Sequence, residues 1–504
     1  MADLYFAALR EGDAPTHMNA VLQRLARLVP SPDRWRSWLV LALLIKTTYF
    51  GISLSQGYYV YRGSCIAAGH PDSSSYFEPL DNLVDTGVYQ PDYRLPGPGA
   101  IYLPLRMVAD AALAKDLFIV AQLLLDVLAV YALAFAAFLL LRSRTAFLIC
   151  FGFYGLASTI SGFNVFLLTE SACASALCFT IYFVARYVRG GSARLLVWAS
   201  FLQAWAYFLR PVLAVYALLF VVFVIVFAWR LGRRPVIAGI AVLLPLSMVQ
   251  ASWSLRNYFV HDRWQLLTTS LWYPSDHQAG AASWELIGTW DRAPEVYFFP
   301  DLPWPDRQSA MIDVRTVPFP KTIRTEIVTI DSLVDLREEC LRLTAMDKAS
   351  PEYGKLDRVL AERFHRYARS VRKEHPLLAY VLTPLRLTAL HVFTASGVRS
   401  LFLAPFDRLP NWAKGVKLFH MMLFLAALYG ALLFIPWSLF TAAGRAFMPL
   451  SVFLVYGLTV HPVVFRLIDV RYLYVLFPVM CLCATLFYFG VLRWWRARVE
   501  QPPN

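Results

Sequence analysis

Long apolar runs constrain the fold of this chain more than any other feature. Of its 504 residues, 58% are hydrophobic and only 16% are charged. Apolar stretches of about 20 residues recur along the sequence, and a helix of that length spans the hydrocarbon core of a bilayer. Lipid cannot hydrogen-bond to the backbone, so such stretches cross it as helices. We therefore predict an all-α polytopic membrane protein with about ten transmembrane helices.

The expected transmembrane ranges follow the apolar runs. The segment 377–403 is also apolar, but Arg386, His391 and Arg399 interrupt it. A mixed polar and apolar surface suits the headgroup layer, so we expect a re-entrant or interfacial helix there. The predicted transmembrane ranges are 37–55, 117–141, 145–163, 165–185, 195–209, 211–229, 235–253, 415–437, 447–465 and 471–491.

Basic residues set the expected orientation of these helices. The net charge is +13, and most Arg clusters lie at the ends of alternate apolar runs. Such clusters favour the cytoplasmic side, so membrane orientation explains the charge better than nucleic-acid binding does. We expect a multi-pass protein of the cell (inner) membrane, with its active site on the extracytoplasmic face.

Composition divides the chain into consecutive parts. The stretch after the seventh predicted helix is richer in acidic residues and Pro, and residues 331–375 have helical periodicity. Residues 1–35 lack the pattern of a cleaved signal peptide, so we expect the first helix to be a retained anchor. The expected parts are a cytoplasmic segment (1–36), helices one to seven (37–253) with a catalytic first outer loop (56–116), an extracytoplasmic domain (254–376), a re-entrant or interfacial helix (377–414), helices eight to ten (415–492) and a cytoplasmic tail (493–504).

The first outer loop carries the densest set of candidate residues. Asp72 and Tyr76 are one helical turn apart, and Arg94 precedes a Leu-Pro-Gly-Pro turn. Asp72 could act as a general base at the membrane surface, and the alternative is a turn former or helix cap. Arg94 could bind a phosphate or the loop carboxylate, and the alternative is an ordinary cation at a loop end. Asp81 and Asp85 are expected to face solvent on a short amphipathic helix.

Charged residues within the apolar runs form a second set. Glu170 lies near the outer end of the fourth predicted helix, and Arg210 begins the sixth on the same side. A carboxylate at that depth needs a partner or water, and Arg210 is a suitable partner. Lys46 and Asp126 lie deeper and could form one buried structural pair. The alternative for these two residues is a proton or ion path.

A third set of polar residues lies at the outer ends of later helices. Arg residues there oppose the orientation bias, so they favour an anionic partner such as a lipid phosphate. The alternative is a cation whose side chain snorkels to the membrane surface. This set comprises Arg256, Asn257, His461, Arg466, Arg471 and Tyr472.

No motif in the sequence indicates a cofactor. It has no P-loop, Rossmann fingerprint, HExxH motif or Ser-His-Asp signature. The seven Cys are scattered, and no spacing suggests a metal site or a disulfide framework. We therefore expect the Cys to be small core residues, with no cofactor and no metal.

Short motifs follow one another along the chain in an order that resembles one enzyme family. The family is that of the polyprenyl-phosphate-dependent glycosyltransferases of the C fold (GT-C), in the branch with protein O-mannosyltransferases and lipid A aminoarabinose transferases. The resembling motifs are Asp72-Ser-Ser-Ser-Tyr76, Gly87-Val-Tyr89, Arg94-Leu-Pro-Gly97, Thr169-Glu170-Ser171, Arg210-Pro211, Ser252-Trp-Ser-Leu-Arg256-Asn257, His375-Pro376 and Arg471-Tyr472.

The resemblance implies an inverting glycosyltransferase that moves a hexose or pentose from a polyprenyl-phosphate donor to a glycan, lipid or protein acceptor. Asp72 matches the family's loop aspartate, which deprotonates the acceptor. The Arg residues would hold the lipid phosphate and stabilise it as a leaving group. Two positions depart from the family: Ser73 follows Asp72 where many relatives carry a second acid, and Asp81 stands where Ala is common.

Two other functional classes compete with this reading. A membrane transporter or lipid flippase would usually show internal repeats with broken helices at matching positions, and no such repeat is apparent. A non-catalytic assembly factor with a degenerate transferase fold is the other alternative, since Ser73 replaces the second acid. The sequence leaves the sugar and the acceptor open.

Overall fold

The computed structural model describes residues 30–91, 94–262, 264–267, 278–291, 297–299, 314–395, 401–466, 468 and 470–499. Within these ranges every regular element is a helix, apart from isolated bridges of Ala68 with Val60 and Phe166. The predicted all-α class is therefore confirmed. The chain forms two compact units: unit 1 is Met1–Leu267, Ser396–Leu454 and Tyr474–Asn504, and unit 2 is Thr268–Ala395 and Val455–Leu473.

Several helices have the length and apolar character of membrane spans. Eight segments of the described chain meet both conditions. Their outward faces expose large apolar side chains such as Leu44, Leu218 and Met248, as expected where lipid covers the protein. The chain is thus a multi-pass membrane protein. The segments are α3 (Trp35–Leu54), α6 (Ala111–Leu141), α8 (Glu170–Gly190), Pro211–Arg230 with α10 (Ala214–Arg230), α11 (Pro235–His261), α17 (Asn411–Phe440), Arg445–Phe465 with α18 (Met448–Val460), and Phe477–Trp495 within α20 (Phe477–Val499).

The predicted helix 145–163 is wrong in its extent. Helix α7 (Arg144–Gly155) has only 12 residues. Two side chains of α3 bind the carbonyls at its end: Lys46 Nζ donates to Tyr154 O at 3.2 Å, and Tyr49 Oη donates to Leu156 O at 2.8 Å. Because these carbonyls are satisfied from outside the helix, the chain can leave the helix here and continue as a buried connector.

The other differences concern helix ends. Helix α9 (Ala193–Leu209) has 17 residues and falls just short of a full span. The predicted helix 165–185 begins only at Glu170. The last predicted helix is divided into α19 (Val470–Val475) and α20, with Pro478 in the first turn of α20. Proline has no N–H to continue a preceding helix, so a break at this point is expected.

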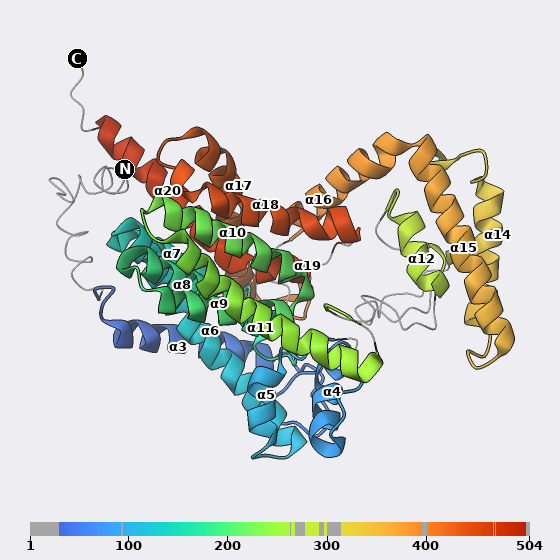
Figure 1. The fold of residues 1–504 in the computed structure, drawn as a ribbon, viewed down its shortest axis with the longest axis horizontal. Helices are drawn as coiled ribbons and strands as arrows, with labels where there is room; N and C mark the ends of the chain where they lie inside the picture. Colours follow the sequence, from blue (N-terminus) through green and yellow to red (C-terminus); the bar gives the residue numbers. More distant parts are fainter. Residues whose placement is uncertain are drawn as a thin grey trace. The chain divides into compact units, whose positions relative to one another are not determined.

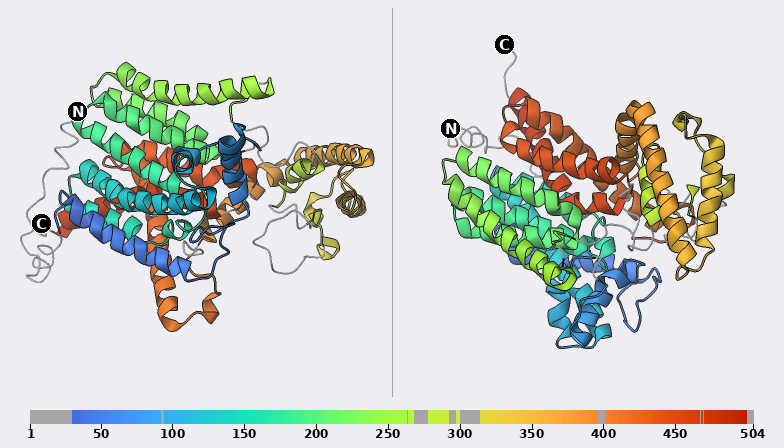
Figure 2. Two further views of the ribbon diagram at one scale, coloured as in Figure 1. Left: turned by 90° about the horizontal axis from the view of Figure 1, so that it is seen from below. Right: turned by 45° about the vertical axis from the view of Figure 1, so that its right-hand side comes forward.

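Unit 1 is a bundle of neighbouring helices (Figure 1). Helix α6 packs against α3 and α8, α8 packs on α9, and α9 and α10 both pack on α11. Helix α20 joins the bundle by packing against α17 and α7. The short helices α4 (Ser73–Thr86) and α5 (Gly99–Arg106) lie at one end of this bundle, as the two further views in Figure 2 also show.

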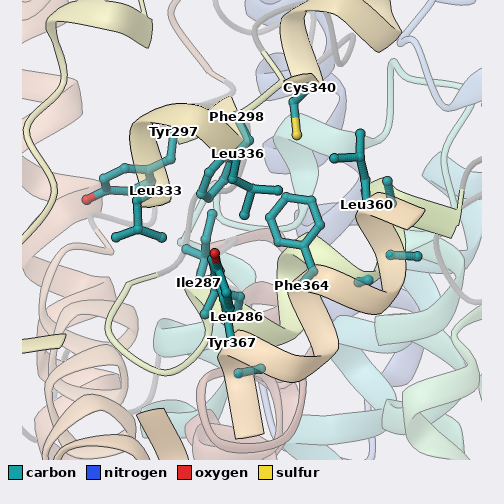
Figure 3. Close-up of a cluster of buried hydrophobic side chains, with 14 of the residues drawn as sticks. Leu286, Ile287, Tyr297, Phe298, Leu333, Leu336, Cys340, Leu360, Phe364 and Tyr367 are labelled. Carbon is teal, nitrogen blue, oxygen red and sulfur yellow. The ribbon is translucent and has the colours of Figure 1, made fainter. Parts of the chain in front are cut away.

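Unit 2 has a hydrophobic core of its own. Helices α12 (Gln278–Ile287), α14 (Ile330–Thr344) and α15 (Pro351–Glu374) supply most of it. Figure 3 shows Phe364 of α15 close to Leu336 of α14 and to Phe298. Thr329 and Ser350 accept backbone hydrogen bonds and so cap α14 and α15.

Helix α15 is followed by a sharp bend. Beyond His375-Pro376 the chain turns by 101° into the segment Leu378–Phe393, which contains α16 (Thr383–Phe393). The residue before a proline avoids the helical conformation, which explains the position of the bend. The predicted re-entrant or interfacial helix begins in this segment, and its residues 396–400 lie outside the described ranges. Its relation to the membrane stays a prediction.

Candidate active site

Ser73 fixes the position of Asp72. The Ser73 side chain is fully buried at the start of α4, where its hydroxyl donates to Leu167 O at 3.0 Å and accepts from His70 N at 2.9 Å. A second acid at position 73 would be unfavourable, because an ionised carboxylate has no hydrogen to offer the Leu167 carbonyl. The departure at Ser73 therefore has a structural cause.

The Asp72 carboxylate is turned toward the Arg94 guanidinium and the His70 ring. Asp72 occupies the N-cap position of α4, but its side chain makes no capping hydrogen bond. Its Oδ1 lies 3.4 Å from Arg94 Nη2, and its Oδ2 lies 3.7 Å from His70 Nδ1. The Asp72 and Arg94 side chains are 29% and 31% exposed, so solvent or a ligand can reach this pair.

Arg94 is held on its other sides by α4. Its Nε donates to Ser75 Oγ at 3.2 Å, and its Cζ lies 4.8 Å from the centre of the Tyr76 ring. A guanidinium above an aromatic ring at this distance makes a cation–π contact. The structure thus brings the predicted residues Asp72, Tyr76 and Arg94 together.

The turn after Arg94 is locked to helix α9. Trp205 Nε1 donates to Gly97 O at 2.9 Å. A Cβ at Gly97 would lie 2.5 Å from Leu209 N and from the carbonyl carbon of Phe208, so only glycine fits. This close approach fixes the Arg94 turn beside Arg210, the next residue of the chain after α9.

Glu170 and Arg210 form the ion pair that the sequence predicted. Both side chains are buried, at 0% and 5% exposure. Glu170 Oε2 also accepts a hydrogen bond from Thr169 N at 3.0 Å. A buried ion pair is stable only with good geometry and further hydrogen bonds. In this structure the two side chains bind each other inside the bundle, and direct contact with a substrate stays a prediction.

Arg256, in the last turns of α11, approaches the segment between α3 and α6. Its Nη2 donates to Tyr89 O at 3.1 Å, and its Cζ lies 5.1 Å from the Trp253 ring and 5.6 Å from the Tyr89 ring. Its Nη1 donates to Oδ1 of the buried Asn257 at 3.0 Å. The predicted pair Arg256-Asn257 is therefore joined to that segment through Tyr89.

Tyr89 was not among the site residues predicted from the sequence. Its hydroxyl donates to Arg94 O at 3.0 Å, while its carbonyl accepts from Arg256. It therefore connects two of the predicted cationic residues, which are far apart in the sequence. The Gly87-Val-Tyr89 motif was the only sequence signal for it, and nothing in that motif indicated a partner.

A buried polar network lies within the helices of unit 1. Lys46 and Asp126 form the predicted pair at 3.3 Å, with both side chains fully buried. Lys46 Nζ donates to Ser161 Oγ at 2.8 Å, and Asn164 Nδ2 donates to Asp126 Oδ2 at 3.0 Å. Ser171 in turn donates to Asn164 Oδ1. These bonds hold the connector between α7 and α8, which favours the structural reading of this pair over an ion path.

Asp81 does not face solvent as expected. Its carboxylate accepts from Tyr102 Oη at 2.6 Å, from Lys115 Nζ at 2.7 Å and from Arg106 Nε at 3.3 Å. These contacts tie α4 to α5 and α6. Burial, together with the hydrogen bond to Asp81, raises the pKa of the Tyr102 hydroxyl well above its ordinary value. Asp85 is 55% exposed, as predicted, and pairs with Arg106.

The remaining predicted residues belong to unit 2. His461 stacks on Tyr472, with ring centres 3.9 Å apart. Arg466 Nη2 donates to Ala379 O at 2.9 Å, and Arg471 is half-buried near the start of α19. Their role in substrate binding stays a prediction. In the described part of the chain, no group of three or more His, Cys, Asp or Glu could hold a metal ion.

Comparison with known proteins gives one distant likeness to report. No family model and no curated protein matches the chain. The archaeal oligosaccharyltransferase AglB from Archaeoglobus fulgidus, solved in complex with an inhibitory peptide and a dolichol-phosphate, is similar to it in structure, with a TM-score of 0.45 and 10% sequence identity. The match covers 94% of this chain and 52% of AglB, so the chain spans about half the length of that protein.

Proposed function

We propose that this protein is an inverting glycosyltransferase that moves a sugar from a polyprenyl-phosphate donor to an extracytoplasmic acceptor. The observation that carries the proposal is the Asp72 cluster. A carboxylate with no capping role is held beside a guanidinium, and both are accessible. The carboxylate can deprotonate a nucleophile, and the guanidinium can stabilise an anionic leaving group.

In the proposed reaction, Asp72 accepts the proton of an acceptor hydroxyl or amine. The acceptor atom attacks the anomeric carbon on the face opposite the phosphate, and the bond between that carbon and the phosphate oxygen breaks. The polyprenyl phosphate leaves with the electron pair and gains negative charge. Arg94 and Arg256 stabilise that charge, since guanidinium groups make charge-assisted hydrogen bonds to phosphate oxygens. Tyr76 holds Arg94 in place through the cation–π contact.

Glu170 and Arg210 have a supporting role in this proposal. Arg210 directly follows Leu209, whose backbone meets Gly97 of the Arg94 turn. The ion pair therefore keeps the end of α9 in the position that the turn requires. His461, Arg471 and Tyr472 lie in unit 2, and their part in substrate binding stays a prediction.

The test is sugar transfer by the purified full-length protein with a radiolabelled polyprenyl-phosphate sugar. We expect Asp72→Asn to lower the rate by about 10²–10⁴-fold, the usual contribution of a positioned general base. The matched control is Asp85→Asn on the same helix, which removes an exposed carboxylate and should leave transfer unchanged. Full turnover by a folded Asp72→Asn protein would refute the role of Asp72.

The same assay separates an enzyme from a transporter or flippase. An enzyme releases the labelled sugar from its lipid or transfers it to an acceptor, whereas a transporter only moves the intact lipid across the bilayer. Reconstituted vesicles in which the label stays on the lipid but changes leaflet would favour the transporter.

A further inference from the structure

Within the described residues of unit 2, Arg466 has a buried nitrogen that makes no hydrogen bond. It caps the C-terminal end of the short π-helix His461–Phe465 and has a backbone φ of +54°. Its Nη2 donates to Ala379 O, but its Nη1 is buried and makes no hydrogen bond within the described structure. Leaving a buried charged donor unsatisfied is costly, so such a group requires an explanation.

A second cation makes the position of Arg466 still less favourable. Burial is the main factor that lowers the pKa of the Arg466 guanidinium, and the positive charge of Arg372 on α15 lowers it further. Arg372 is itself engaged: it pairs with the Glu285 carboxylate and donates to Glu285 O at 3.4 Å. The unsatisfied donor therefore belongs to Arg466, while Arg372 adds positive charge beside it.

The surroundings of Arg466 hold it in this conformation. A Cβ at Gly288 would lie 2.7 Å from Arg466 Cγ, so the side chain packs closely on the end of α12. Thr383 Oγ1 donates to Thr289 O at 2.9 Å and ties the same end to α16. A non-glycine residue with positive φ persists only where its surroundings fix it, and such residues cluster at functional sites.

We propose that Arg466, with Arg372 beside it, forms an oxyanion site for a phosphate group within unit 2. A guanidinium nitrogen that lacks a partner offers a charge-assisted hydrogen bond, and phosphate oxygens match the planar geometry of guanidinium. Phosphate binding at Arg466 requires neither Asp72 nor a sugar donor, so it can be tested apart from the proposed sugar transfer. A lipid headgroup and a soluble phosphate present the same chemistry to it.

The experiment measures phosphate binding by the full-length protein in nanodiscs of phosphatidylcholine. Inorganic phosphate is titrated by calorimetry at constant ionic strength, with chloride as the counter-titration. We expect Arg466→Gln to weaken phosphate binding by about tenfold or more, the value of one lost charged hydrogen bond. Arg369→Gln is the matched control, because Arg369 is an exposed residue of α15 that donates only to His365 O among the bonds described.

Two further measurements identify the source of the phosphate and show whether a loss of binding results from misfolding. Vesicles with phosphatidic acid are compared with vesicles of phosphatidylcholine alone, and dependence on Arg466 in the first would assign a lipid phosphate. Arg466→Lys keeps the charge but loses the planar group, so it should bind phosphate more weakly than the natural protein while folding normally. The proposal is overturned if neither phosphate source binds, or if both bind Arg466→Gln and the natural protein equally. Because no sugar transfer is measured, this outcome is independent of the proposed activity.

Discussion

Two ion pairs of unit 1 have the same chemical groups and opposite surroundings. Asp72 and Arg94 are each about one third exposed, whereas Glu170 and Arg210 are almost completely buried. An accessible pair contributes little to stability and leaves its groups available for a ligand. Removing one partner of a buried pair lowers stability strongly, because the other charge stays buried without a counter-ion, and a ligand cannot reach the pair from solvent. Burial, rather than residue type, therefore distinguishes the candidate base Asp72 from the structural pair Glu170 and Arg210.

Breaking the buried pair should have the largest effect on stability. We expect Glu170→Gln to lower the free energy of unfolding by about 3–5 kcal/mol, because Arg210 keeps a buried charge without its counter-ion. Thermal and denaturant unfolding of the purified protein measures the change. Glu78→Gln, which removes the half-exposed partner of the exposed Arg62, should cost almost nothing. A paired change, Glu170→Leu with Arg210→Met, should recover part of the loss, and equal losses in the single and paired variants would contradict this account.

Substitution of Gly97 should cause the second largest loss of stability. A methyl group at Gly97 meets backbone atoms at 2.5 Å, and backbone cannot move aside as a side chain can. We expect Gly97→Ala to destabilise the protein by about 1–3 kcal/mol, as overpacking does elsewhere. It should also lower transfer, because it shifts the Arg94 turn. Gly51→Ala is the control, since nothing lies within 4 Å of a Cβ there. Equal stabilities of the two variants would show that the turn is not locked to α9.

Removing the accessible carboxylate should change stability very little. We expect Asp72→Asn to lower the free energy of unfolding by less than about 1 kcal/mol, as for other solvent-exposed pairs. The same unfolding experiment as for Glu170→Gln provides the measurement. A loss as large as that of Glu170→Gln would mean that Asp72 is a structural residue, and it would remove the contrast between the two pairs.

The smallest effect concerns the partly exposed cluster of Glu285, His365 and Arg372 in unit 2. Burial alone would raise the pKa of this carboxyl, but hydrogen bonds and charges of His365 and Arg372 outweigh it, so the pKa lies below its ordinary value of 4.5. The pairing therefore adds stability above pH 4.5, and that stability is lost as the pH falls through the lowered pKa. Glu285→Gln should remove this acid-dependent part of the unfolding curve. A natural protein and a variant with the same pH dependence below 4.5 would contradict the assignment.

Local patterns in the sequence predicted part of the candidate site. Asp72 and Tyr76 are one turn apart, and the helix that they imply exists as α4. Glu170 and Arg210 were matched because the predicted topology put both at the outer side, on the fourth and sixth predicted helices, and they do form a pair. Such predictions work where spacing along one helix, or the alternation of helices across a membrane, already limits the possible partners.

Contacts between backbone and distant side chains could not be predicted. The end of α7 depends on Lys46 and Tyr49 of α3, and neither residue carries a sequence signal for that role. Gly97 was expected to form a turn, but its approach to Leu209 requires the packed position of α9. Tyr89 connects Arg94 to Arg256 only because α11 extends to His261, beyond the predicted end at 253.

The amino-acid sequence alone establishes that this chain is helical and crosses a membrane, because long apolar segments must satisfy their backbone hydrogen bonds internally when they lie in lipid. It also identifies the charged residues whose burial in a membrane helix would be unfavourable without a partner. Which of those pairs are buried and which remain open to a ligand follows from the packing of the folded chain. Burial depends on how helices distant in sequence pack together, and residue spacing does not contain that information.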